Sequence, residues 1–248
     1  MVARSPALDL IRDGLMASAS AFLRNVRWTA GATCWVCAGI PSNSSYSTCY
    51  QCDGRSHSPE RADRVGFVTY AWNGHQSGHT MYVYKGAQSA PTSLELVRSL
   101  LAYAVVAHWA CIGQRAGSQP DAWTYVPSLA NRPGPHPVGQ LARPIMGTVP
   151  YIPVNAAGTV HDPRSFRPEN FVVGATPPRH VFVLEDSWVT VGRTQSVAGA
   201  PKRAGLEQVT ALVVARFLTP GFAHTNEFMT TLTEPFDPTI CPYYGERC

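Results

Sequence analysis

The architecture is indicated most directly by residues 181–194, which read Val181-Phe-Val-Leu-Glu185-Asp186-Ser-Trp-Val-Thr190-Val-Gly192-Arg193-Thr194. A short apolar run ends in two adjacent carboxylates, and a turn containing threonine, glycine and arginine follows. Residues 194–204 then resemble a helix closed by Gly205, and residues 209–215 resemble a second apolar strand. Strand, helix and strand within about 35 residues predict a βαβ unit and therefore a parallel sheet.

Chemistry is expected at the end of the first strand, because ligands of parallel α/β sheets bind outside the carboxyl ends of strands. Glu185 and Asp186 stand at such an end. Gly192 lies near the start of the following helix, where backbone N–H groups bind phosphate and glycine permits close approach. Two carboxylates beside a phosphate cradle can hold ribose hydroxyls, directly or through Mg²⁺. The alternative is a solvated pair at the strand end and an ordinary helix cap.

The whole chain has 248 residues, which suits one large α/β domain with additions or two small domains. Its net charge of +4 is mild enough to be explained by arginines around a phosphate site. The sequence contains no stripe of basic and aromatic residues that would predict direct nucleic-acid binding. No apolar run approaches the roughly 20 residues that span a bilayer, and the first residues lack a signal-peptide pattern. A soluble, cytoplasmic protein is expected.

Four of the seven cysteines form two pairs, Cys34-x-x-Cys37 and Cys49-x-x-Cys52. Two such turns can place four thiolates tetrahedrally around one structural Zn²⁺. The alternative is two disulfides in a secreted protein, against which the odd cysteine count and the absent signal pattern argue. Of the other three cysteines, Cys111 is expected to be a thiol in the core. Cys241 and Cys248 could form a disulfide with each other, supplement a metal site or remain free thiols, and the sequence leaves these alternatives open.

Four regions are expected along the chain. They are an N-terminal amphipathic helix within residues 1–29, a zinc ribbon in 30–56, the α/β domain with a hood region in 57–218, and a C-terminal tail in 219–248. The amphipathic helix is expected to cover residues 5–26, where apolar side chains recur at helical spacing.

Within the α/β domain, strand-like runs at 65–72 and 80–85 predict a hairpin. A long helix is expected over residues 91–112, followed by a short buried strand at 122–126. Residues 129–178 are rich in proline and glycine, which predicts long loops with a binding or lid function.

Residues 181–216 resemble the signature region of type I phosphoribosyltransferases, which consists of an apolar strand, two acidic residues, a Thr/Gly loop, a helix and another strand. With a four-cysteine segment in front, the order over about residues 30–220 is similar to that of ComF-type phosphoribosyltransferases. Tyr84-Lys85, Val126-Pro127-Ser128 and the loop 132–136 also resemble that family. The resemblance implies a central, mainly parallel sheet flanked by helices.

The resemblance further implies binding of phosphoribosyl pyrophosphate (PRPP) with Mg²⁺ and transfer of the phosphoribosyl group to an unidentified acceptor, with release of pyrophosphate. Glu185 and Asp186 would contact the ribose hydroxyls as the catalytic pair. The remaining PRPP-binding residues would be the 5-phosphate loop Thr190, Val191, Gly192, Arg193 and Thr194, and a pyrophosphate-facing group of Ser128, Arg132 and Lys85. The expected partners are PRPP and the acceptor, and the chain could also form a homodimer.

Two positions depart from the family pattern. Glu185 stands where a first Asp is usual, and Val191 stands where a small residue usually follows the threonine. The β-branched Val191 disfavours positive φ and narrows the phosphate loop, while Arg193 could bind phosphate through its planar fork. Three functions therefore stay open: a phosphoribosyltransferase, a binding or regulatory module without turnover that could be linked with DNA uptake, and an α/β enzyme acting on another phosphate ester.

Overall fold

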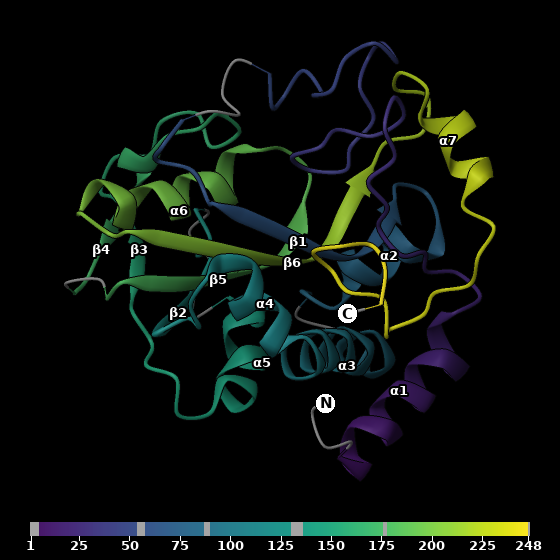
Figure 1. Ribbon diagram of the computed structural model, residues 1–248, viewed down its shortest axis with the longest axis horizontal. Helices are drawn as coiled ribbons and strands as arrows, with labels where there is room; N and C mark the ends of the chain where they lie inside the picture. Colours follow the sequence, from purple (N-terminus) through teal and green to yellow (C-terminus); the bar gives the residue numbers. More distant parts are fainter. Residues whose placement is uncertain (1–4, 54–57, 87–89, 130–135, 176–177, 248) are drawn as a thin grey trace.

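A four-stranded parallel sheet lies at the centre of the computed structural model, which describes residues 5–53, 58–86, 90–129, 136–175 and 178–247 (Figure 1). The strand order is β1 (Arg64–Trp72), β6 (Gln208–Leu218), β5 (His180–Trp188) and β2 (Ala122–Tyr125). All three pairings are parallel, with Leu184 opposite both Leu212 and Tyr125. The helix α6 (Gly192–Arg203) connects β5 to β6. The predicted βαβ unit and parallel sheet are confirmed.

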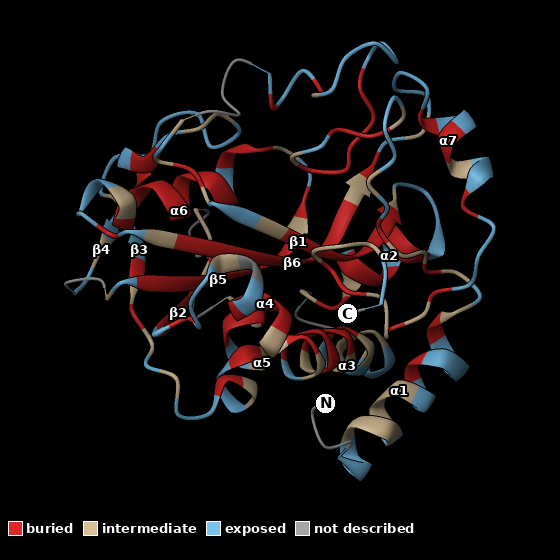
Figure 2. Ribbon diagram, in the orientation of Figure 1, coloured by how far each residue is buried: buried red, intermediate tan, exposed pale blue. Residues whose placement is uncertain are grey.

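The two central strands, β5 and β6, are buried on both faces (Figure 2). Strands of parallel sheets are covered on both sides, so they consist of nearly continuous apolar runs rather than alternating patterns. The run from Val181 to Leu184 and the run from Ala211 to Ala215 both have this character. Two covering layers are therefore required.

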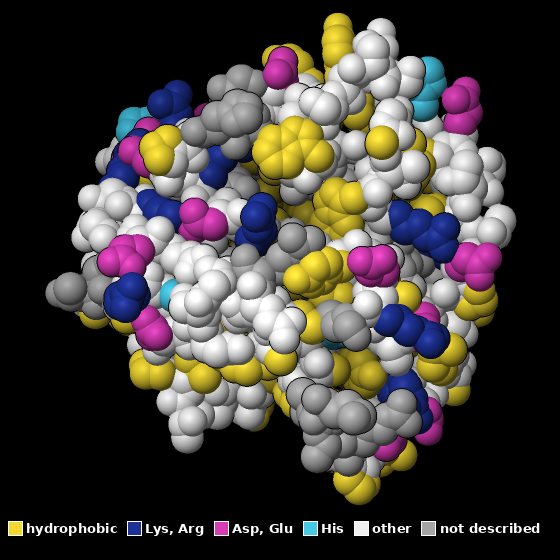
Figure 3. Space-filling view, viewed as in Figure 1, with side chains coloured by type: hydrophobic (Ala, Val, Ile, Leu, Met, Phe, Trp, Pro, Cys, Tyr) yellow, Lys and Arg dark blue, Asp and Glu magenta, His cyan; other side chains and the backbone are white. Residues whose placement is uncertain are grey.

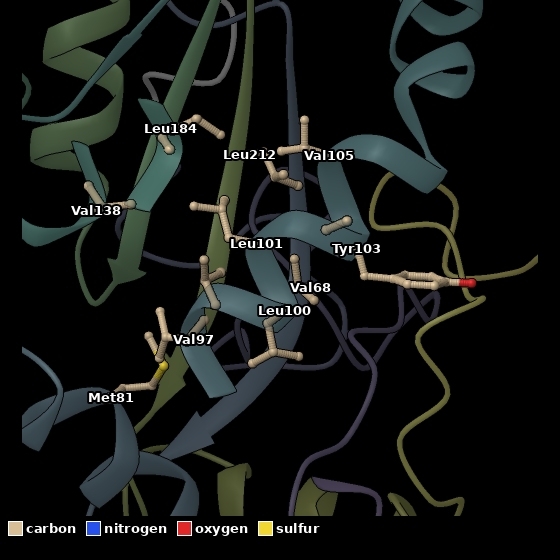
Figure 4. Packing of buried hydrophobic residues seen from close by; sticks show 14 of the residues in the cluster. Val68, Met81, Val97, Leu100, Leu101, Tyr103, Val105, Val138, Leu184 and Leu212 are labelled. Atoms are coloured by element: carbon tan, nitrogen blue, oxygen red, sulfur yellow. The ribbon is translucent and has the colours of Figure 1, made fainter. Parts of the chain in front are cut away.

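One layer consists of helices α3 (Pro91–Ala107), α4 (Trp109–Ala116) and α5 (Pro137–Met146), with α1 (Pro6–Ala19) packed against α3. The apolar residues of α3 recur at the three- and four-residue spacing of a buried helix face. Leu101 of this face points into the core formed with Leu184 and Leu212 of the sheet (Figure 4). Within the described ranges, no helix has the length and apolar character needed to cross a membrane.

The opposite face is covered in two parts. Near the amino ends of the strands lie α6, the short antiparallel strands β3 (Val154–Ala156) and β4 (Phe171–Val173), and the 3-10 helix η1 (Pro168–Asn170). The other part is the cysteine-rich N-terminal segment, which packs on Phe67, Trp188 and Val213 of the sheet. Two further helices, α2 (Gln76–Val83) and α7 (Thr225–Thr231), follow β1 and β6.

The hairpin predicted from residues 65–72 and 80–85 is wrong, because most of the second run belongs to α2 and the turn after it. Met81 and Tyr84 are buried whereas Tyr82 is 79% exposed. A three-residue spacing of buried side chains is helical, and the short alternating pattern could not reveal it because it covers little more than one turn.

Several predicted boundaries are also corrected. The N-terminal helix ends at Ala19, and the long helix predicted over 91–112 is divided at His108, where the backbone leaves helical geometry (φ −109°, ψ 13°). Residues 129–178 contain α5 and the short elements of the second layer in addition to loops, since proline in the first turn of α5 is compatible with a helix. Strand β5 continues to Trp188, so the acidic pair lies within the strand.

Replacing Leu101 by alanine should lower the free energy of unfolding by about 3 kcal/mol, because it leaves a cavity between α3 and the sheet. Leu10 of α1 is 76% exposed and serves as the matched control, for which a change below about 0.5 kcal/mol is expected. Urea unfolding followed by circular dichroism measures both. Equal losses in the two variants would contradict the assigned core.

Candidate functional site

A cleft of about 770 Å³ opens at the carboxyl edge of the sheet, where β1, β5 and β6 end. Ligand pockets typically have volumes of about 300–1,000 Å³. Residues of the turn after β1 and of α2 line one side, and the remaining wall includes Lys85, Ser187 and Phe217. The cleft therefore lies at the edge where parallel sheets bind ligands.

Lys85 is held against the end of β5 by a buried carboxylate. Its Nζ lies 2.9 Å from Asp186 Oδ1 and 3.0 Å from Ser187 Oγ. Tyr84 donates a short hydrogen bond to Asp186, and His136 Nε2 lies 3.6 Å from Asp186 Oδ2. Burial alone would raise the pKa of Asp186, but the charges of Lys85 and His136 and the Tyr84 hydrogen bond hold this pKa below its ordinary value. The group is thus an ionised carboxylate that orients an ammonium lining the cleft.

Glu185 makes its contact on the other side of the sheet, because neighbouring side chains of a strand point to opposite faces. Thr194 in the first turn of α6 donates a short hydrogen bond to its carboxylate. Burial raises the pKa of Glu185 to about 7, against the effect of the Thr194 hydrogen bond and in the same direction as the charge of Asp186. The two carboxylates predicted to act as a pair therefore have separate partners.

The predicted phosphate turn, residues 190–194, leads from β5 into α6. Val191 and Thr194 of this turn are buried, Thr190 is half-buried and Arg193 is exposed. A Cβ atom on Gly192 would lie 2.5 Å from the carbonyl carbon and oxygen of Arg164. The close approach that this glycine permits is thus used by the chain's own backbone at residues 164–165.

The remaining predicted PRPP-binding residues are only partly placed. Ser128 is half-buried and follows β2 at the same edge of the sheet, since Val126 donates a hydrogen bond to the Leu184 carbonyl at 3.0 Å. Arg132 lies outside the described residues. Among the described residues that were predicted to bind PRPP, Lys85 is the one that lines the cleft.

The four predicted zinc ligands come together in a buried cluster. The sulfur atoms of Cys34, Cys37, Cys49 and Cys52 all lie within 4.8 Å of one another, and none of these residues is in a disulfide. Cys37 and Cys49 have their sulfurs 3.6 Å apart, close to the edge of about 3.8 Å expected for a tetrahedron with zinc–sulfur bonds of about 2.3 Å. The donor set therefore fits a structural Zn²⁺. Residues 30–53 form turns without a strand, so the expected ribbon is a pair of turns.

Sequence reasoning missed Arg216, which joins this cluster to β6. Its Nη2 lies 3.5 Å from Cys37 Sγ, and it donates to the carbonyl oxygens of Cys37 at 2.8 Å and Trp188 at 3.2 Å. Burial alone would lower the pKa of Arg216, but the thiolates of Cys37 and Cys49 raise it. Four thiolates exceed the charge of Zn²⁺ by two, so a buried guanidinium offsets part of the excess. The signal in the sequence was a lone arginine within an otherwise apolar strand.

Comparisons of the chain with protein-family models, with curated proteins and with solved structures gave no match. Function is therefore argued from the geometry and chemistry of these sites.

Replacing Arg216 by methionine should destabilise the fold by roughly 3–5 kcal/mol, because the excess thiolate charge and two carbonyls lose their buried partner. Zinc affinity should fall on the order of 10–100-fold, as it does when a group supporting the ligands is removed. Competition with a chelator measures the affinity. The exposed Arg193, replaced in the same way, is the control, and unchanged affinity in both variants would contradict the role of Arg216.

Stability should fall as pH rises from 4.5 to about 7, because Glu185 keeps a proton in the folded chain that the unfolded chain releases above its ordinary pKa of 4.5. The contribution is on the order of 3 kcal/mol. The variant Glu185→Gln should lack this loss, whereas Glu207→Gln at an exposed position should retain it. Urea unfolding at several pH values measures the free energy of unfolding of each protein. The same dependence of this free energy on pH in all three proteins would refute the assignment to Glu185.

Proposed function

We propose that this chain is a phosphoribosyltransferase-like protein of ComF type, which binds PRPP in the cleft and transfers the phosphoribosyl group to a small acceptor with release of pyrophosphate. The observation that carries the proposal is the ammonium of Lys85, held at the carboxyl edge of a parallel sheet by Asp186 and Ser187. This is a fixed positive charge in a cleft large enough for a phosphorylated sugar.

The rest of the cleft suits a polyanionic ligand. The first turn of α2 lines it, and N–H groups at a helix N-terminus are donors for phosphate oxygens. His75, Gln76 and His79 add further polar side chains to the same wall. By contrast, the face in Figure 3 carries Lys and Arg interspersed with Asp and Glu, without one large basic area that would suit a nucleic-acid backbone.

In the proposed reaction the acceptor forms a bond to C1 of the sugar while the bond from C1 to pyrophosphate breaks, and pyrophosphate keeps the electron pair. The transition state gains positive charge on the ring and negative charge on the leaving group. Lys85 would stabilise the developing charge on pyrophosphate, and Asp186 would keep its ammonium in place. The chain's contribution is therefore position and charge, since no covalent intermediate is needed.

The residues present do not form a Mg²⁺ site by themselves. Magnesium usually binds through one or two carboxylates together with substrate phosphates. Asp186 is already paired with Lys85 and bonded by Tyr84, and Glu185 is bonded by Thr194. Among the described residues, none of those that line the cleft is a carboxylate, so no step is derived through this ion.

A second candidate function, PRPP binding without turnover, is favoured by the turn 190–194. Glu185 contacts α6 rather than the cleft side, and the backbone at 164–165 packs against Gly192. In the transferase, Glu185 would contact the ribose and the turn at Gly192 would contact the 5-phosphate. Here Thr194 and the backbone at 164–165 take these two places. In this version the protein responds to PRPP as a regulatory or interaction module.

The test is calorimetric titration of the zinc-replete chain with PRPP, with and without Mg²⁺. The double variant Lys85→Met, Asp186→Asn removes both partners of the buried pair, so no unpaired buried charge is left. It should bind PRPP roughly 10–100-fold more weakly, the loss expected for a charge-assisted contact. The double variant Arg98→Met, Glu95→Gln, which removes an exposed ion pair of α3, is the charge-matched control and should bind normally.

Release of pyrophosphate on addition of candidate acceptors would favour the transferase, and tight binding without release would favour the regulatory module. Tighter binding of another phosphosugar would favour the third function considered, an enzyme acting on a different phosphate ester. Wild-type protein that binds no phosphosugar would overturn the proposal.

A further inference from the structure

A second cluster of metal-binding side chains is formed by elements that take no part in the cleft or the four-cysteine cluster. His108, Cys111 and Cys241 are buried, and one ligand atom of each lies within 4.8 Å of the others. His108 lies at the break between α3 and α4, Cys111 lies in the first turn of α4, and Cys241 comes from the C-terminal segment. We propose that these three side chains bind a second Zn²⁺, which has a structural role.

The helix break presents two of the ligands on one side. His108 and Cys111 are three residues apart, a spacing that places side chains on the same face of a helix and is common in zinc sites. His108 Nε2 lies 3.1 Å from the carbonyl oxygen of Pro238. A zinc-bound histidine usually donates its other ring N–H to such an acceptor, which fixes the tautomer and the ring orientation.

The turn at Cys241 repeats the hydrogen bonds of the turn at Cys34. At Cys34, Ala38 N–H donates to the Cys34 carbonyl at 2.8 Å, and Cys34 N–H donates to the Gly39 carbonyl at 2.7 Å. At Cys241, the N–H groups of Gly245 and Cys241 make the equivalent bonds at 2.9 and 2.8 Å.

The fifth residue has positive φ in both turns, 50° at Ala38 and 73° at Gly245. The C-terminal segment therefore presents its cysteine in the backbone geometry that the first cluster uses for a zinc ligand.

The charge of the proposed site suits its burial. Two thiolates and a neutral imidazole around Zn²⁺ give a net charge of zero, so the ion can be buried without a counter-ion. The four-thiolate cluster has an excess of negative charge instead, and there Arg216 lies against Cys37. Nitrogen and sulfur ligands are also the set that zinc prefers in structural sites.

The structure contains Cys111 in a disulfide. The metal-bound form requires Cys111 as a thiolate. A small-molecule thiol supplies the two electrons: its thiolate attacks the disulfide, both protein sulfurs leave as thiolates, and two thiol molecules become one disulfide. Under those conditions the zinc form replaces the disulfide.

Zinc in proteins is usually four-coordinate. The three described ligands carry the proposal, and a water molecule takes the fourth position.

The metal would join the C-terminal segment to the helical layer. Phe236 of this segment is fully buried in the core beneath α1 and α3, and Asp237 and Asn25 exchange two hydrogen bonds of 2.8 Å. Cys111 and Cys241 are 130 positions apart in the numbering, and a cross-link between distant parts of a chain removes much entropy from the unfolded state. The site would therefore stabilise the whole fold.

The test measures zinc per chain by mass spectrometry of the metal in full-length protein prepared with a thiol reductant. Wild-type protein should contain two zinc ions, and Cys37→Ser and Cys241→Ser should each contain one. X-ray absorption at the zinc edge then separates the sites. Zinc remaining in Cys37→Ser should show a nitrogen ligand, and zinc remaining in Cys241→Ser should show sulfur alone.

If a variant fails to fold, X-ray absorption of the wild-type protein still tests the proposal, because the average zinc environment should then include a nitrogen ligand. The conservative variant Cys241→His should retain the second ion, because histidine is also a zinc ligand. One zinc per wild-type chain with sulfur ligands alone, together with Cys111 still in a disulfide under the reductant, would overturn the proposal.

Discussion

A parallel sheet whose central strands are apolar on both sides must be covered twice, and the rest of this molecule depends on how that is achieved. Helices α3, α4 and α5 cover one face in the usual way. On the other face α6 covers only part of the sheet, and the remainder is covered by turns that hold four cysteines. Turns have no extended apolar face of their own, so this part of the cover depends on the buried four-cysteine cluster, whose donor set fits a structural Zn²⁺.

Arg216 connects the metal site to the part of the sheet that bears the cleft. Its guanidinium contacts Cys37 on one side and the Trp188 carbonyl at the end of β5 on the other, while the neighbouring Phe217 lines the cleft. The cysteine cluster thus supports the ends of β5 and β6 from behind. With zinc bound, four thiolates would leave no open coordination position for chemistry, so the role of this cluster would be structural.

A buried ion pair holds the ammonium of Lys85 that lines the cleft. Asp186 would be costly to bury alone, and Lys85 and Tyr84 together satisfy it. The same contacts orient the ammonium toward the cleft and leave Asp186 unavailable as a metal ligand. Glu185, one residue earlier, interacts with Thr194 instead, which links the first turn of α6 to β5. Adjacent acidic residues consequently serve two different layers of the structure.

The sequence by itself determined the βαβ unit and the four-cysteine cluster, because both are encoded locally. Apolar runs of strand length, a glycine after the helix and two Cys-x-x-Cys pairs each carry their signal within a few residues. The sequence also predicted Asp186 and Lys85 as site residues, but it paired Asp186 with its neighbour Glu185 and did not predict its contact with Lys85. That pairing was not available from spacing, since a strand sends neighbouring side chains to opposite faces once its extent is known.

Only the tertiary structure decided the contacts between residues far apart in the chain. Arg216 on Cys37, Lys85 on Asp186 and the meeting of His108 with Cys241 each join segments more than one hundred positions apart in the numbering. The helix break at His108 and the helical state of α2 were also decided by the tertiary structure, because burial against distant elements overrides a short local pattern. Local chemistry specified the elements, and packing between them specified the sites.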